Sequence, residues 1–253
     1  MFHLKYFKPH IFAPPIFRAC HTGNIDKLRR LLSKGVNANI RENDGLTPLM
    51  VAALRGKKAA VKILIEHGAN VNTWDNAGNT PLIFASMNTS RWIQGFQMYH
   101  NYWMSRPAYP DPSQNEFINI QYSETDQDQY TGVARKLINA GADVNAISTQ
   151  YWTPLMYSAF SGNNKMTELL LLNGAKIEAR NSDGLTPLML AVLRDKSSAV
   201  SILIEHGADV NAEDRDGDDV MLIASYKKNA RIIQLLKDCG AKSEVTICRR
   251  KSK

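Results

Sequence analysis

The sequence holds few side chains whose type and spacing would support catalysis or metal binding. His67 and His206 each precede a glycine at the same place in two similar segments, and one interpretation of this recurrence is a pair of metal ligands. The other interpretation is structural, because a helix dipole favours a histidine at the C-terminal end. The two histidines would also belong to different copies of the repeated segment described below, so they would lie far apart, and we expect no metal site.

The cysteines indicate free thiols. Cys20, Cys239 and Cys248 are odd in number, far apart and without C-x-x-C spacing, which argues against a disulfide framework or a zinc site. This pattern favours a reducing compartment and a cytoplasmic location. Cys20 is followed by His21, but neighbours in sequence point apart on a helix, so the two do not suggest a catalytic pair.

Motifs for nucleotide binding and hydrolysis are missing. The chain contains no G-x-x-x-x-G-K-[ST], G-x-G-x-x-G, G-x-S-x-G or H-E-x-x-H. Asp216, Asp218 and Asp219 are grouped, but aspartate is common in turns. We therefore predict that the protein is not an enzyme and uses no cofactor; an enzyme would need its site on the inserted segment described below.

The net charge of +7 belongs to the two ends of the chain. Seven of the 31 Lys and Arg residues lie in residues 1–18 and 249–253, where no acidic residue occurs, so residues 19–248 are formally neutral. A neutral body has no field that would track phosphates. The basic tail, residues 246–253, leaves open an alternative function, binding of nucleic acid or an anionic membrane. No signal peptide and no transmembrane segment is expected.

Two motifs recur at a step of 33 residues, which decides the expected fold. Thr-Pro-Leu begins at Thr47, Thr80, Thr153 and Thr186. A glycine follows a leucine-rich stretch at Gly35, Gly68, Gly141, Gly174, Gly207 and Gly240. Threonine is a good N-cap, proline fits the first helical position, and glycine permits the left-handed residue that ends a helix. The pattern predicts repeated pairs of short helices.

These segments resemble the ankyrin repeat, whose pattern places T-P-L-H-x-A at the start of a first helix and L-L-x-x-G-A-D-V-N after a second. Leu203 to Asn211 reads L-I-E-H-G-A-D-V-N. The resemblance implies an all-α solenoid of about six helix-turn-helix repeats with β-hairpin-like connections. We expect an N-terminal extension over 1–12, the repeats over 13–245 and the tail over 246–253. The family histidine is replaced by Met50, Ile83, Met156 and Met189, which predicts apolar packing in its place.

One interval departs from the step and locates an insert of 40 residues, about 88–127, between the helices of the third repeat. Trp92, Phe96, Tyr99 and Trp103 fall on one face of a helix. Two interpretations stay open: the stripe packs on the solenoid, or it shapes a binding surface. Ser123 to Gln129 is polar and acidic, and we expect it to be mobile.

The resemblance implies a protein–protein interaction module, with contacts through the hairpin tips and the exposed surface of the first helices. Aromatic and arginine side chains are the most enriched at binding hot spots. The predicted partner-binding residues are Trp74, Tyr151, Trp152, Phe160, Arg55, Arg194, Tyr226, Tyr99, Tyr102 and Trp103. We expect a monomer and no small-molecule substrate. The family includes eukaryotic proteins and secreted effectors of intracellular bacteria, which would act in the host cytoplasm, and the residues fit both.

Four hairpin asparagines, Asn39, Asn72, Asn145 and Asn211, each follow a leucine by eight residues. This context resembles the one used by asparaginyl hydroxylases on ankyrin hairpins. The alternative, which we favour, is that these asparagines hydrogen-bond their own turns.

Overall fold

The computed structural model describes residues 14–87 and 124–242. Within these residues, twelve helices form six packed pairs. The first helices of the pairs are α1 (Pro15–Thr22), α3 (Pro48–Leu54), α5 (Pro81–Met87), α8 (Pro154–Ser161), α10 (Pro187–Leu193) and α12 (Val220–Lys227). The second helices are α2 (Ile25–Ser33), α4 (Lys58–Glu66), α7 (Glu124–Asn139), α9 (Asn164–Leu172), α11 (Ser197–Glu205) and α13 (Ala230–Asp238).

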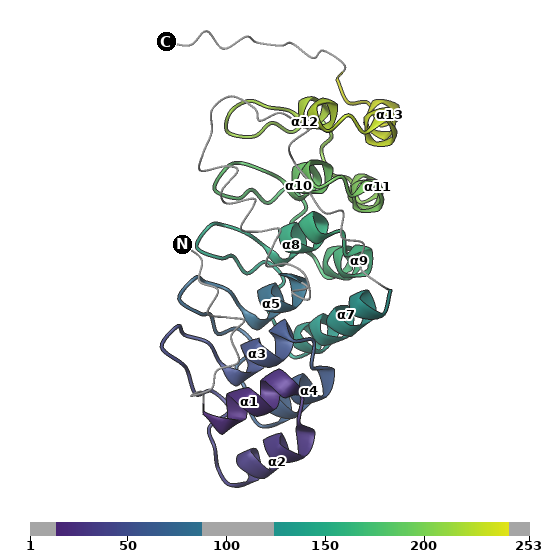
Figure 1. Cartoon of the computed structure of the whole chain (residues 1–253). Coiled ribbons are helices and arrows are strands. Elements are labelled where there is room, and N and C mark those ends of the chain that lie inside the picture. Colours follow the sequence, from purple (N-terminus) through teal and green to yellow (C-terminus); the bar gives the residue numbers. More distant parts are fainter. Residues whose placement is uncertain (1–13, 88–123, 243–253) are drawn as a thin grey trace.

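The pairs stack into a solenoid of two helical layers (Figure 1). Each first helix packs against the first helices of the neighbouring pairs, and the second helices form the other layer. The connections between pairs all project to one side, on the left of Figure 1. One connection contains an isolated antiparallel bridge, between Glu213 and Asp219. The predicted all-α solenoid is confirmed.

The Thr-Pro motif starts the first helices as its chemistry predicts. The Thr47 hydroxyl accepts a hydrogen bond from the backbone N–H of Met50 at 3.3 Å, and Pro48 occupies the first turn, where its missing N–H needs no partner. The buried Met50 sulfur lies 3.4 Å from the Thr47 N–H, which makes it a weak acceptor in a reciprocal capping box. The same pair of contacts joins Thr186 and Met189. Methionine in the place of the family histidine therefore packs and also caps.

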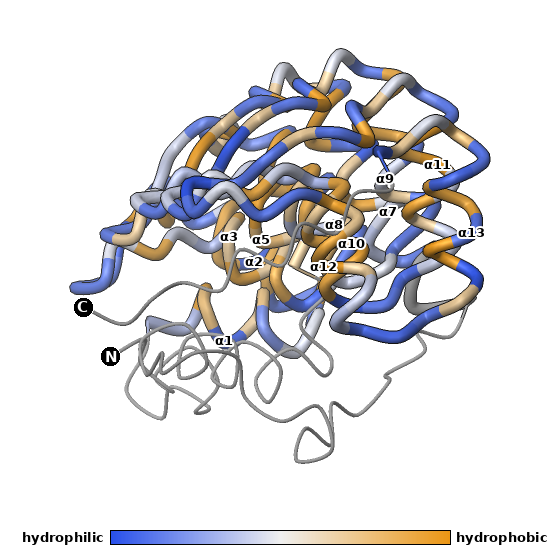
Figure 2. The backbone as a smooth tube through the Cα atoms, turned by 90° about the horizontal axis from the view of Figure 1, so that it is seen from above, coloured by the Kyte–Doolittle hydropathy of each residue, from blue (hydrophilic) through white to orange (hydrophobic). Residues whose placement is uncertain are grey.

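The core runs through the stack as one continuous apolar cluster. All seven residues of α3 are buried, and the first helices are mostly hydrophobic in Figure 2, where they lie between the connections and the second helices. The second helices alternate between hydrophobic and hydrophilic residues because only one of their faces meets the first helices. Each pair thus depends on its neighbours to bury its apolar surface.

Helix α7, which pairs with α5, has 16 residues, whereas α4 and α9 beside it have nine. Of the segment that was expected to be mobile, Ser123 to Gln129, the residues from Glu124 onward belong to this helix, which includes the last four residues of the predicted insert. Residues 88–123, with the predicted aromatic stripe of Trp92, Phe96, Tyr99 and Trp103, lie outside the described residues.

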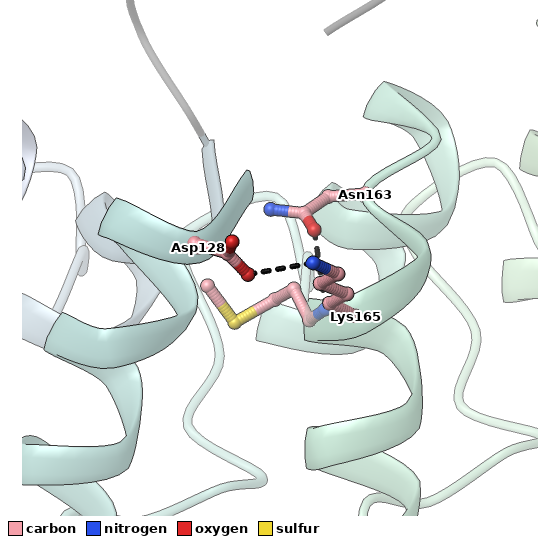
Figure 3. Close-up of polar contacts among 4 residues, drawn as sticks. Asp128, Asn163 and Lys165 are labelled. Carbon is pink, nitrogen blue, oxygen red and sulfur yellow. Dashed lines mark hydrogen bonds and ion pairs between the residues drawn. The ribbon is translucent and has the colours of Figure 1, made fainter. Parts of the chain in front are cut away.

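The first turns of α7 contact the pairs on both sides. The Gln129 amide donates to the Gly56 carbonyl at 3.1 Å, and the Tyr130 hydroxyl donates to the Leu54 carbonyl at 3.3 Å. On the other side, the Asp128 carboxylate forms a 2.7 Å ion pair with the Lys165 ammonium at the start of α9 (Figure 3). These contacts bind the end of α3 and the start of α9 to the same helix.

Candidate protein-binding surface

The connections between pairs are ordered by hydrogen bonds within and between them. The buried Asp75 carboxylate accepts from the backbone N–H groups of Ala77 and Asn79, at 2.9 and 2.7 Å, and so closes its own turn. Adjacent turns are joined through their backbones, as in the 2.9 Å bond from the Thr149 N–H to the Ala77 carbonyl. The tips therefore form a continuous, regularly spaced surface.

The hairpin asparagines bridge neighbouring connections. The Asn72 amide donates to the Gly141 carbonyl at 2.9 Å, and its oxygen accepts from the Asp143 N–H at 2.8 Å. Asn39, Asn145 and Asn211 bridge in the same manner. The interpretation that these asparagines bond their own turns is wrong.

The side chain two residues earlier makes the bond within each of these turns. The Asn70 side chain accepts from the Asn72 N–H at 2.9 Å, and the Asp143 carboxylate accepts from the Asn145 N–H at 2.8 Å. One of the two side chains therefore closes its own turn with a hydrogen bond, and the other forms hydrogen bonds to the next turn.

Glu178 occupies the position that follows Asn145 by one repeat of 33 residues. Its carboxylate accepts from the Asp209 N–H at 2.9 Å, but a carboxylate cannot donate to the next carbonyl as an asparagine amide does. The link from this connection to the next one is therefore chemically weaker than its counterparts.

Three large apolar side chains are exposed on two adjacent connections. Trp74 is 62% exposed in the connection from α4 to α5, and Ile147 and Tyr151 are 51% and 56% exposed in the connection from α7 to α8. The bonds from Asn72 to residues 141 and 143, and from Thr149 to Ala77, hold these two connections side by side. We call Trp74, Ile147 and Tyr151 the hairpin patch.

Tyr151 has an unusual backbone conformation, with φ of 60°. The equivalent residues of the other connections, Gly45, Gly78, Gly184 and Gly217, have φ between 75° and 81°. A residue with a side chain is destabilised by about 1–2 kcal/mol in this left-handed region, whereas glycine is not. The array thus keeps an exposed aromatic residue where local stability favours glycine, and such strain tends to occur at functional sites.

Arg41 fixes the backbone beside Trp74. Its guanidinium donates to the Thr73 hydroxyl at 2.9 Å and to the Trp74 carbonyl at 2.5 Å. The backbone under the exposed indole is therefore held by the preceding connection, which reduces the entropy that Trp74 would lose on binding.

Trp152 and Phe160 do not belong to the exposed surface, which corrects their predicted role as contact residues. They are 1% and 2% exposed, and their rings pack edge-to-face with centroids 5.5 Å apart. The Tyr157 ring lies against Trp152, with 4.8 Å between centroids. Burial raises the pKa of the Tyr157 hydroxyl, which keeps it neutral. This aromatic cluster lies directly after Tyr151 in the chain and supports the connection from inside.

The other predicted contact residues lie away from the hairpin patch. Arg55 and Arg194 are half-buried at the C-terminal ends of α3 and α10, and Tyr226 is exposed near the end of α12. The Arg194 guanidinium stacks on the Phe160 ring, 4.7 Å from its centroid. Tyr99, Tyr102 and Trp103 lie outside the described residues.

The model of the family "Ankyrin repeats (3 copies)" matches residues 16–94, 126–214 and 164–247, which together cover most of the chain. The chain belongs to the ankyrin-repeat family. Ankyrin repeats are generally protein–protein interaction modules and are typically not catalytic. No curated protein matches the sequence. Within residues 14–87 and 124–242, this ankyrin array has no helix long and apolar enough to cross a membrane and no cluster of three potential metal ligands.

Ile147 was missed as a candidate contact residue. It occupies the same position of the ankyrin repeat as Trp74, and the next repeats have Arg180 and Glu213 there. Aligning the connections by their repeat position would have shown two successive large apolar residues at a place that is otherwise charged. Isoleucine is not among the aromatic and arginine residues that are most enriched at hot spots, so residue type alone does not single out Ile147.

Proposed function

We propose that this ankyrin array binds another protein through the hairpin patch of Trp74, Ile147 and Tyr151. The observation that supports the proposal most directly is Tyr151, an aromatic residue exposed at a position with positive φ. Its conformation lowers the stability of the folded chain. A contact between the Tyr151 ring and a partner would explain why a destabilising residue is kept at this position. Trp74 and Ile147 add apolar area beside it, and clustered aromatic and apolar anchors carry most of the energy of many interfaces.

The patch is also pre-organised for binding. The turns beneath it are closed by Asp75 and by the Ser148 hydroxyl, which accepts from the Trp152 N–H at 3.2 Å. Arg41 holds the backbone at Trp74. A surface that is ordered before binding loses little conformational entropy when the partner arrives.

The test compares the proteins captured by the immobilised wild-type array with those captured by Tyr151→Asn and Trp74→Ala. Asparagine tolerates positive φ, so Tyr151→Asn removes the ring with little change of the backbone. We expect both variants to lose the partner that the wild type retains. Leu172→Ala is the matched control, since Leu172 is exposed near the end of α9 and outside the patch. Capture of the same proteins in equal yield by all four arrays would contradict the proposal.

Three further predictions about binding remain proposals. Tyr99, Tyr102 and Trp103 would extend the surface, and Tyr99→Ala with Trp103→Ala would then weaken capture without changing the melting temperature. The basic tail, residues 246–253, would supply the alternative function of binding nucleic acid or an anionic membrane, and its deletion would remove salt-dependent binding. If this protein is a secreted bacterial effector, the immobilised array would capture a host protein. If it is a eukaryotic adaptor, the array would capture a protein of its own cell.

A further inference from the structure

Side chains at one position of the repeat form a row across the hairpin tips. In the order of the connections, the row contains Arg41, Trp74, Ile147, Arg180 and Glu213, and all five are exposed. The connections project to the same side of the solenoid, and backbone hydrogen bonds join each one to the next (Figure 1). We call these five residues the tip row. Its two apolar residues therefore lie between two arginines.

The two arginines are held in the same way, by the backbone of the following connection. The Arg41 guanidinium donates to the carbonyl of Trp74, the next residue of the row, at 2.5 Å. The Arg180 guanidinium donates to the carbonyl of Glu213, again the next residue of the row, and to the Gly184 carbonyl at 2.9 Å. Both guanidinium groups are thus oriented before a partner arrives, which reduces the entropy that they would lose on binding.

These contacts orient the two guanidinium groups without neutralising them, because carbonyl and hydroxyl oxygens carry no net charge. Within residues 14–87 and 124–242, neither Arg41 nor Arg180 forms an ion pair. Arg180 uses only its Nη1 in its contacts with that part of the chain, so the Nε and Nη2 groups keep their N–H donors. Such a pair of donors matches the two oxygens of a carboxylate.

We propose that the tip row binds a segment of the partner protein in which two apolar residues lie between two acidic residues. This inference rests on the proposed function, since Trp74 and Ile147 belong to the hairpin patch, and it specifies the chemistry of the partner. The two carboxylates would pair with Arg41 and Arg180, and the apolar side chains would pack on Trp74 and Ile147. An acidic residue beyond Arg180 would meet the like charge of Glu213, so the acidic contact ends there.

The spacing of the row determines the spacing of the matching residues. Neighbouring helices pack about 8–10 Å apart, and the connections that follow them are spaced in the same way. An extended chain advances ~3.3 Å per residue, so about three residues cover one step of the row. Trp74 and Ile147 are also one step apart, because the bond from the Thr149 N–H to the Ala77 carbonyl joins their connections directly. The matching pattern is therefore Glu-x-x-Leu-x-x-Leu-x-x-Glu, in which Leu stands for a large apolar residue.

The experiment measures the fluorescence anisotropy of the labelled, C-terminally amidated decapeptide Glu-Ser-Ser-Leu-Ser-Ser-Leu-Ser-Ser-Glu with the full chain. A second peptide carries Gln at both ends. We expect the wild type to bind the glutamate peptide at least about fivefold more tightly than the glutamine peptide, with a smaller difference at high salt. Arg41→Gln with Arg180→Gln should remove this preference. The matched control is Arg215→Gln, an exposed arginine of the connection from α11 to α12 outside the tip row, which should keep it.

A charge reversal separates recognition from folding. Arg41→Glu with Arg180→Glu should bind a peptide with Lys at both ends more tightly than the glutamate peptide, which a loss of folding cannot produce. The inference is overturned if the wild type does not bind the glutamate peptide or binds both peptides equally. It is also overturned if the double glutamine variant keeps the preference, or if the preference depends on residues 246–253 instead.

The same variants distinguish this inference from the proposed function. If the peptide preference is absent while capture of the partner still depends on Trp74 and Tyr151, only this inference falls and the proposed function stands. If capture does not depend on Trp74 and Tyr151, the proposed function itself falls.

Discussion

The asparagine bridges between connections can be tested with a graded series at Asn145. Its amide donates to the Gly174 carbonyl at 3.0 Å, and its oxygen accepts from the Lys176 N–H at 2.8 Å. Asn145→Ala removes both bonds. Asn145→Asp keeps the acceptor and loses the donor at nearly the same size. The series thus separates the two halves of the bridge.

The expected magnitudes follow from the number of bonds lost. A hydrogen bond contributes about 0.5–1.5 kcal/mol net, and these bonds lie near the surface, where the lower part of that range applies. Asn145→Ala should therefore lower the free energy of unfolding by about 1–2 kcal/mol, and Asn145→Asp by about half as much.

The chain offers the reverse experiment at Glu178. Glu178→Asn should retain the bond from the Asp209 N–H, now 2.9 Å from the carboxylate, and should add a donor toward the Gly207 carbonyl. We expect this variant to gain about 0.5–1 kcal/mol, because the missing half of the bridge is restored.

Urea unfolding followed by far-UV circular dichroism measures the whole series, with Leu172→Ala as a surface control. The order of midpoints should be Glu178→Asn, wild type, Asn145→Asp and Asn145→Ala, from highest to lowest. If Asn145→Ala unfolds at the wild-type midpoint, or if Glu178→Asn unfolds below it, the bridges do not stabilise the stack and the reasoning is refuted.

Further predictions concern single positions. Gly141 has φ of 86°, so Gly141→Val should lower the free energy of unfolding by about 1 kcal/mol or more, and an unchanged melting temperature would contradict this. Trp152→Ala should lower the free energy of unfolding by about 3–5 kcal/mol because it leaves a cavity in the aromatic cluster, and thermal denaturation would measure this loss. Cys239 is exposed and should react with a thiol reagent in the folded chain, whereas Cys20 should react only on unfolding, which peptide mapping after labelling can establish. Burial raises the pKa of the Cys20 thiol from 9.0 to about 12. The unfolded chain therefore loses this proton first, so stability should fall as pH rises above 9.0, and Cys20→Ala should flatten that fall.

The helix pairs could be predicted from the sequence because their signals are local. Thr47 and Pro48 start a helix through contacts within one turn, and Gly141 ends one through its own backbone. The repeat of these signals every 33 residues then fixes the stack. Pairs of this kind cannot bury their apolar surface alone, so the recurrence of the motif already implied that neighbours cover one another.

The errors came from contacts that the pattern of a single helix or turn does not report. Trp152 was assigned to the surface because it adjoins a hairpin tip, but Tyr157 and Phe160 cover it. The start of α7 is polar and was expected to be mobile, but Gln129 bonds to the end of α3 and Asp128 pairs with Lys165 of α9. Which side of a residue is covered depends on the elements that pack against it, within its own pair or in the next one, and the periodicity of one segment does not report it.

The length of α7 also has a consequence for the order in which the chain folds. Short helices are poorly stable alone. A helix of 16 residues, such as α7, is more stable than one of nine, because elongation adds a hydrogen bond for each residue once nucleation has occurred. Helix α7 contacts α3, α4, α5 and α9, so it joins three successive pairs. We expect the folding nucleus of this quasi-one-dimensional chain to form around α7, with structure spreading from there toward both ends. The amide protons of α7 would then be among the last to exchange with solvent, and those of α2 and α13 among the first.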